Sequence, residues 1–151
     1  MTTLVLVRHA KAVAHRGIDA ERALADRGNR EAPLIGRWLA EQGVAPDLAV
    51  VSPAVRTRQT WDLAAAAFGP VTTTVDDRLY ANTTGDLLAV IRATPADVTT
   101  LVLVGHNPSI ESLAAALDAS AGTFPTSATA VFDLPGGWTD VSATLTAFWT
   151  P

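Results

Sequence analysis

The sequence contains no cysteine. Disulfide bonds, thiolate zinc sites and cysteine nucleophiles are therefore excluded. The sequence also lacks an apolar run of membrane-spanning length, and it does not begin with a basic segment followed by a long apolar stretch and a small-residue cleavage site. We therefore expect a soluble, cytoplasmic protein.

The sequence contains fewer positively charged than negatively charged residues. Eleven Lys and Arg residues stand against fifteen Asp and Glu residues, giving a formal net charge of −4. This balance argues against a general binder of nucleic acid or anionic membranes, so any positive site must be local. A length of 151 residues with 48% apolar content suits one globular domain, and we expect that single domain to span residues 1–151.

Continuous aliphatic runs of strand length occur at residues 4–7, 48–51 and 101–104. Such runs are typical of parallel strands that are covered by helices on both faces. A further short strand is expected at residues 71–75, and a terminal hairpin at residues 128–134 and 141–148. The pattern predicts an α/β fold, a three-layer α/β/α sandwich whose central sheet is mostly parallel with a C-terminal antiparallel edge hairpin.

Helices are expected between these strands. One carries an apolar stripe over residues 34–39 and ends at Gly43, with Pro33 marking its start or a kink. A second is expected to start at Ser52-Pro53 as N-cap and first residue and to run to about residue 68. Two more are expected over residues 85–93 and from Asn107-Pro108 to about residue 117.

Polar residues follow the three aliphatic runs. In TLVLVRHA the aliphatic run is followed by Arg8 and His9, in TLVLVGHN it is followed by Gly105 and His106, and the third run is followed by SPAVRTRQT. The last string places Arg56 near a helix start, where free N–H groups and the helix dipole favour an anion. Because ligands of open α/β sheets bind beyond the carboxyl ends of the strands, we expect these residues in one site. Arg58 lies about 200° around the helix from Arg56 and is expected at the surface.

This set of histidines and arginines has no obvious carboxylate partner within its motifs, which suits a divalent metal poorly. Guanidinium groups match phosphoryl oxygens, and a neutral imidazole nitrogen can attack phosphorus. The residues therefore favour phosphoryl chemistry, and we expect no metal and no cofactor.

Three motifs in this order resemble the histidine phosphatase superfamily, which includes the phosphoglycerate mutases. They are RHA at 8–10, in place of the family's RHG, SPAVRTRQT at 52–60, and GH at 105–106. The short chain, with GIDAERALADRG at 17–28 and RLYANTTGDLL at 78–88, is most similar to the compact SixA-type phosphohistidine phosphatases.

The resemblance implies a role for each matching residue. His9 would be the nucleophile that becomes phosphorylated, while Arg8, Arg56 and His106 would surround the phosphoryl oxygens. Arg22 would contact phosphate or substrate. Donors in these places would stabilise charge in the transition state. The attacking nitrogen of His9 must be neutral, so its other nitrogen should donate to a backbone carbonyl or a similar acceptor.

The chain departs from the family at two positions. Ala10 replaces a glycine, and Ala81 aligns where many relatives carry a glutamate that acts as general acid. An imidazole leaves more easily than an alkoxide, so the missing acid favours a phosphoramidate substrate. Asp19 and Glu21 are candidates to replace this acid, although ordinary loop charges are the preferred interpretation for both.

Other charged residues near the motifs have simple interpretations. The loop after His9 carries Lys11, His15 and Arg16. These residues are interpreted either as solvated charges or as groups that attract an acidic partner. Glu111 near a helix start is expected to complement the helix dipole.

We therefore expect a metal-independent phosphohistidine phosphatase that acts through a phospho-His9 intermediate. Its partner would be a phosphohistidine-bearing signalling protein, because no long insertion covers the site, or else a small phosphorylated substrate. No nucleic acid or membrane partner is expected. The alternatives are a broad phosphatase for small phosphate esters or phosphopeptides, and a phosphate-binding regulatory module without turnover.

Overall fold

The structure is a computed structural model that describes residues 2–15, 17–80 and 82–151. A six-stranded sheet in the order β3-β2-β4-β1-β5-β6 forms its centre. β1, β2, β3 and β4 are parallel, and β5 runs antiparallel to both β1 and β6. The expected α/β class with an antiparallel C-terminal hairpin is confirmed. The strands are β1 (Thr2–Arg8), β2 (Leu48–Val51), β3 (Thr72–Val75), β4 (Thr100–Gly105), β5 (Thr129–Leu134) and β6 (Thr144–Trp149).

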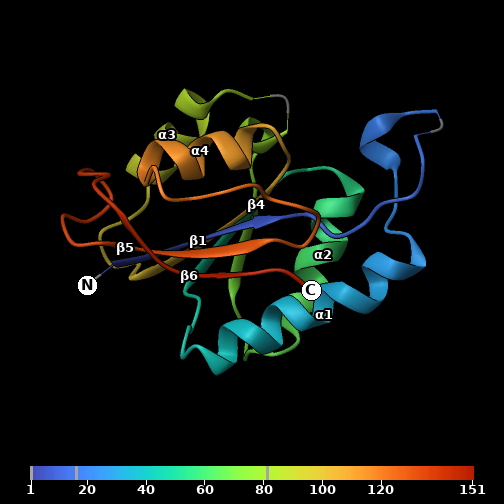
Figure 1. Cartoon of the computed structure of the whole chain (residues 1–151), viewed down its shortest axis with the longest axis horizontal. Helices are drawn as coiled ribbons and strands as arrows, with labels where there is room; N and C mark the ends of the chain where they lie inside the picture. Colours follow the sequence, from blue (N-terminus) through green and yellow to red (C-terminus); the bar gives the residue numbers. More distant parts are fainter. Residues whose placement is uncertain (1, 16, 81) are drawn as a thin grey trace.

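Helices cover both faces of the sheet (Figure 1). α3 (Thr84–Arg92) and α4 (Ser109–Leu117) pack on one face, and α1 (Asp26–Glu41) and α2 (Val55–Ala65) pack on the other. Two short 3₁₀ turns, η1 (Asp19–Glu21) and η2 (Asp77–Leu79), lie in the loops after β1 and β3. Among the described helices, none has the length and apolar content needed to cross a membrane.

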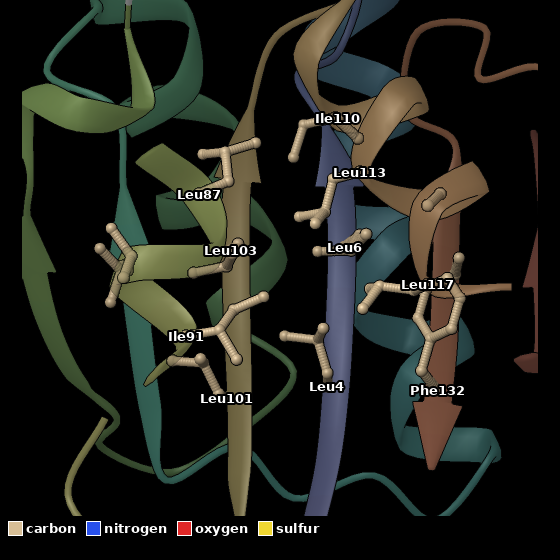
Figure 2. Close-up of a cluster of buried hydrophobic side chains, with 14 of the residues drawn as sticks. Leu4, Leu6, Leu87, Ile91, Leu101, Leu103, Ile110, Leu113, Leu117 and Phe132 are labelled. Carbon is tan, nitrogen blue, oxygen red and sulfur yellow. The ribbon is translucent and has the colours of Figure 1, made fainter. Parts of the chain in front are cut away.

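Alternating side chains of the two TLVLV strings supply both halves of the core. Leu4 and Leu6 of β1 pack under α3 and α4 together with Leu101 and Leu103 of β4, as Figure 2 shows. The valines between them face α1 and α2. A strand buried on both faces needs apolar residues at every position, which explains why the two strings look alike.

The two strings also pair in register. Leu4 lies opposite Leu101, and the pairing continues to Arg8 opposite Gly105. The N–H of His9 then donates to the carbonyl oxygen of Gly105 at 3.1 Å. His9 and His106 therefore leave neighbouring strands at the same edge of the sheet.

The helix predicted over residues 85–93 is confirmed as α3, but the starts of the other three helices differ from those expected. α1 begins at Asp26, so Pro33 lies inside the helix and the prediction that it marks the start is wrong. The apolar stripe of the sequence begins late because the first two turns pack through the small residues Gly28 and Ala32.

The predicted N-caps of α2 and α4, a serine and an asparagine that are each followed by proline, are also wrong. α2 begins at Val55 with Ala54 as N-cap, and it ends at Ala65. α4 begins at Ser109 with Pro108 itself as N-cap. The hydroxyl of Ser52 lies near His106 instead, which removes it from the capping role.

The C-terminal hairpin is confirmed with a longer connection. β6 begins at Thr144, three residues after the predicted start, so residues 135–143 join the two strands.

Candidate active site

His9 and His106 form the centre of the site. Their ring centroids lie 5.3 Å apart with an interplanar angle of 55°. The two residues are buried, at 8% and 7% exposure. Burial, together with the nearby positive charges of Arg56 and Arg8, lowers the pKa of His9 to about 4. Burial likewise lowers the pKa of His106 to about 3. Both rings are therefore neutral near pH 7.

The ring of His9 has one free nitrogen. Its Nδ1 lies 2.7 Å from the carbonyl oxygen of Ala10, which can only accept a hydrogen bond. The proton of the neutral ring therefore lies on Nδ1, and Nε2 keeps its lone pair. This arrangement confirms the expected contact with a backbone carbonyl.

The loop after β1 is held by residues of the SPAVRTRQT string. The hydroxyl of Thr60 accepts from the N–H of Ala10 at 2.9 Å and donates to the carbonyl oxygen of Arg56 at 2.7 Å. Gln59 accepts from the N–H of Leu24 at 2.8 Å. Ala10 is fully buried in a small cluster with Leu24 and Ala32, so its methyl group fills space where the family pattern has a glycine.

Arg56 points into the fold and Arg58 points away from it. Arg56 is 6% exposed, and its Nη1 and Nη2 donate to the carbonyl oxygen and to Oδ2 of Asp19 at 2.9 and 3.0 Å. Arg58 is exposed, and its Nε donates to the carbonyl oxygen of Pro53. The expected difference between the two arginines is confirmed.

Arg8 is held from the opposite side by the loop before β5. Its Nη1 donates to the carbonyl oxygen of Phe124 at 2.9 Å, and Asn107 donates to the same oxygen at 2.9 Å. The N–H of Phe124 in turn donates to Oε1 of Glu111 at 2.6 Å. Burial lowers the pKa of Arg8, and the charge of Glu111 opposes this shift. Glu111 lies in the first turn of α4 as expected, and it also anchors the peptide that holds Arg8.

Asp19 is part of the site, so its interpretation as an ordinary loop charge is wrong. Besides Arg56, its carboxylate accepts from Nη1 of Arg22 at 3.0 Å and from the hydroxyl of Tyr80 at 2.6 Å. The bonds to Tyr80, Arg22 and Arg56 hold the pKa of Asp19 well below its usual value. An ionised carboxylate with these partners has no proton to give. Glu21 is exposed, as a loop charge would be.

Arg22 is anchored within the loop. Its Nε and Nη2 both donate to the carbonyl oxygen of Val13, at 3.1 and 3.0 Å. Its role as a contact for phosphate or substrate stays a prediction. Lys11 and His15 of the same loop are exposed. Arg16 and Ala81 lie outside the described residues.

Sequence reasoning missed Tyr80. Its ring meets the ring of His106 edge-on, with centroids 5.5 Å apart and an angle of 87°. The only signal was its position in RLYAN, directly before the residue that aligns with the general acid of relatives. Tyr80 thus connects Asp19 to His106 across the site.

Several buried nitrogens of the site lack a partner. Nε of Arg8, Nε of Arg56 and Nδ1 of His106 have none among the residues that the structure describes. Buried donors without partners are costly, and an anion would satisfy them. An open hollow of about 570 Å³ lies beside Arg22, lined by Val13, Ala14, Glu21 and Ala23. Within the described ranges, no group of three metal-ligating side chains lies together.

Comparison with known proteins assigns the chain to a family. The model of the histidine phosphatase superfamily (branch 1) matches residues 4–87. The chain belongs to the histidine phosphatase superfamily. The uncharacterized protein Rv1276c of Mycobacterium tuberculosis is 38% identical over 160 residues, covering 96% of this chain and 99% of the relative.

Solved structures of histidine phosphatases extend the likeness over nearly the whole chain. One from Nakamurella multipartitia, provisionally assigned as phosphohistidine phosphatase SixA, has a TM-score of 0.89 and 32% identity, covering 99% of this chain and 96% of that one. The protein histidine phosphatase SixA complexed with tungstate has a TM-score of 0.87 and 26% identity, covering 97% of this chain and 96% of that one.

This histidine phosphatase brings most of its predicted site residues together. Arg8 and His9 leave β1, His106 leaves β4, and Arg56 lies in the first turn of α2, close enough to His9 to lower its pKa. The sequence placed these four correctly at the carboxyl edge of the sheet. Asp19, Tyr80 and the contact between Ser52 and His106 are additions that come from the structure.

Proposed function

We propose that the chain is a metal-independent phosphohistidine phosphatase, one domain over residues 1–151, that acts on a protein-borne phosphohistidine through phospho-His9. The observation that carries the proposal is the ring of His9. Its Nδ1 is committed to the carbonyl oxygen of Ala10 at 2.7 Å, so the lone pair of Nε2 is free beside Arg8, Arg56 and His106. A neutral imidazole in that setting is ready to attack an anionic phosphoryl group.

The reaction proceeds in two displacements. Nε2 of His9 forms a bond to phosphorus while the phosphorus–nitrogen bond to the substrate breaks, and the electron pair of that bond returns to the substrate imidazole. The positive charge that develops on the ring of His9 is stabilised by the bond from Nδ1–H to Ala10. Water then attacks phosphorus, the bond to Nε2 breaks, and phosphate leaves while the surplus proton passes to solvent.

The protonation states of the side chains in the site favour a phosphoramidate substrate over a phosphate ester. Asp19 is ionised, and its hydrogen bond raises the pKa of Tyr80, so neither side chain is a ready acid. An alkoxide leaving group needs a proton, whereas the imidazole of a protonated phosphohistidine leaves neutral. The relatives described as SixA phosphohistidine phosphatases support the same substrate class.

A protein substrate fits the surroundings of the site. The hollow beside Arg22 is open, and the aliphatic side chains of Val13 and Ile18 nearby in the sequence are 42% and 63% exposed. These exposed aliphatic side chains favour a protein substrate, whose surface would contact them, over a small phosphate ester. The cytoplasmic location and the absence of a metal requirement stay predictions.

Comparison of substrates tests this function. We expect a phosphohistidine-bearing signalling domain to give a kcat/KM at least about tenfold higher than small phosphate esters, a difference of about 1.4 kcal/mol in transition-state stabilisation. A chelator should leave both rates unchanged. Higher kcat/KM on esters, or loss of activity with chelator and its return with added metal, would contradict the proposal.

A further inference from the structure

Ser52 lies directly behind the second histidine of the site. It follows β2, is fully buried, and its Oγ lies 2.8 Å from Nε2 of His106. Its backbone groups are already satisfied, because its N–H donates to Val104 and its carbonyl oxygen accepts from Thr57. In the contact between Ser52 and His106, either the hydroxyl or Nε2 can supply the proton.

The hydrogen-bonding capacity of Ser52 favours one of the two choices. A serine hydroxyl has a single hydrogen to give. The oxygen of Ser52 already accepts from the N–H of Ala54 at 3.3 Å, and Nε2 of His106 is the one acceptor that its hydrogen reaches among the described residues. With the proton on Nε2, the hydroxyl hydrogen of Ser52 would be buried without an acceptor, at a cost of about 1–3 kcal/mol. With the proton on Nδ1, the contact between Ser52 and Nε2 is complete, and the unpartnered Nδ1–H is the donor that a bound anion can satisfy.

We propose that Ser52 is a positioning residue that donates its hydroxyl hydrogen to Nε2 of His106 and so holds the ring proton on Nδ1. Burial keeps His106 neutral, so the ring carries one proton and the choice of nitrogen matters. Nδ1 is buried and has no partner within the described ranges. Tyr80 holds the plane of the ring from its edge.

This tautomer makes His106 a donor at the place where a donor is needed. With the proton on Nδ1, the ring offers an N–H to a phosphoryl oxygen in transit between substrate and His9, without adding a charge beside Arg8 and Arg56. With the proton on Nε2, Nδ1 would present a lone pair to an anion and repel it. This consequence rests on the proposed function, whereas the position of the proton does not.

The position of the proton can be measured in the free protein by nitrogen-15 NMR of the histidine rings. The chemical shifts of the ring nitrogens separate protonated from unprotonated atoms, and the variants His9→Asn and His15→Gln assign the signals. We expect wild-type His106 to be protonated on Nδ1 and unprotonated on Nε2. The opposite tautomer in the wild-type protein would overturn the proposal without any variant and without any turnover.

Variants then test the role of the hydroxyl. Ser52→Ala should mix the two tautomers and lower kcat with little change in KM. We expect a loss of about tenfold or more, below the loss of a whole oxyanion donor, which costs about 100- to 1000-fold. Ser52→Thr, which keeps a hydroxyl, should restore the Nδ1–H signal and part of kcat.

Thr94→Val is the matched control, because it removes a hydroxyl that follows the end of α3 and donates to the carbonyl oxygen of Val90, with no contact to either histidine. It should leave both the tautomer and kcat as in the wild type. If Ser52→Ala keeps the pure Nδ1–H tautomer, or if Thr94→Val lowers kcat equally, Ser52 does not position His106. If the tautomer is as proposed but no phospho-His9 forms, the proposed function fails and this inference stands.

Discussion

At the scale of single residues, the carboxylate of Asp19 links side chains from distant parts of the sequence. It contacts Arg56, 37 positions away, and Tyr80, 61 positions away. The hydrogen bond from the Tyr80 hydroxyl to an ionised carboxylate favours the neutral phenol, which raises the pKa of Tyr80 above its usual value of 10.0. This coupling gives a direct spectroscopic test of the site.

Tyr80 is the sole tyrosine of the sequence, so the ultraviolet absorbance of its phenolate reports on this site alone. We expect Asp19→Asn to lower the pKa of Tyr80 toward its usual value, because the amide carries no charge. Glu21→Gln, in the same 3₁₀ turn but exposed, is the control and should leave the titration unchanged. Equal titration curves for Asp19→Asn and the wild type would show that the two side chains do not interact in solution.

Residues of the site differ in how well the sequence predicts them. His9, Arg8, Arg56 and His106 lie in strings whose position after a buried strand or at a helix start already indicates their chemistry. Asp19 could not be assigned in this way, because its role arises from contacts with Arg56 and Tyr80 that depend on the folding of two separate loops. Local sequence shows only an acid in a polar turn.

At the scale of helices and strands, close approach of α1 and α2 depends on Gly36. A Cβ atom at this position would lie 1.9 Å from the carbonyl oxygen of Ala64. Gly36→Ala should therefore destabilise the protein by about 1–3 kcal/mol, although alanine is the better helix former. The free energy of unfolding in denaturant measures this loss.

Gly85→Ala in α3 is the matched variant. A Cβ atom there would meet only the hydroxyl of Thr83, at an ordinary 3.6 Å. Because alanine has a higher helix propensity than glycine, Gly85→Ala should raise the free energy of unfolding by a few tenths to about 1 kcal/mol. If both alanines stabilise the protein, α1 and α2 lie farther apart in solution than the 1.9 Å approach at Gly36 implies.

The elements themselves were predictable to different degrees. The aliphatic runs located β1, β2 and β4, because a strand covered on both faces requires apolar residues at each position. The start of α3 was located within one residue, but those of α1 and α2 were not, because the hydroxyl of Ser52 contacts His106 and the first turns of α1 pack through Gly28 and Ala32. Local capping patterns cannot reveal that a side chain is used elsewhere.

At the scale of the whole molecule, the two buried histidines couple stability to pH. Their pKa values in the folded protein are about 4 for His9 and about 3 for His106, below the ordinary 6.5 of the unfolded chain. Below pH 6.5 the unfolded chain therefore binds more protons than the folded protein, so stability falls as pH falls. Above pH 6.5 both states hold these rings neutral, and the contribution is fully present.

We therefore expect the free energy of unfolding to decrease between pH 6.5 and about 4. The total decrease should be on the order of a few kcal/mol. Denaturant unfolding at a series of pH values measures it. His9→Asn should make the curve shallower, because only His106 then contributes, while His15→Gln, at the exposed third histidine, should leave the slope unchanged. A curve with no slope in this range would mean that the histidines are solvated.

The sandwich as a whole was predictable from alternating strands and helices, but the convergence of the site was only partly so. The in-register pairing of β1 with β4 brings His9 beside His106, and the sequence shows two similar strings without their register. The loop that carries Phe124 reaches Arg8 from 116 positions away, which no local pattern indicates.

The central claim is that His9 carries the phosphoryl group during turnover. Rapid acid-free denaturation after mixing with a labelled phosphohistidine donor, followed by peptide mass spectrometry, tests it most directly. The account predicts a label on His9 that is stable to alkali and lost in acid, absent from His9→Asn although that variant stays folded. Turnover by the wild type with no label on His9 at any mixing time, or activity retained by His9→Asn, would contradict it.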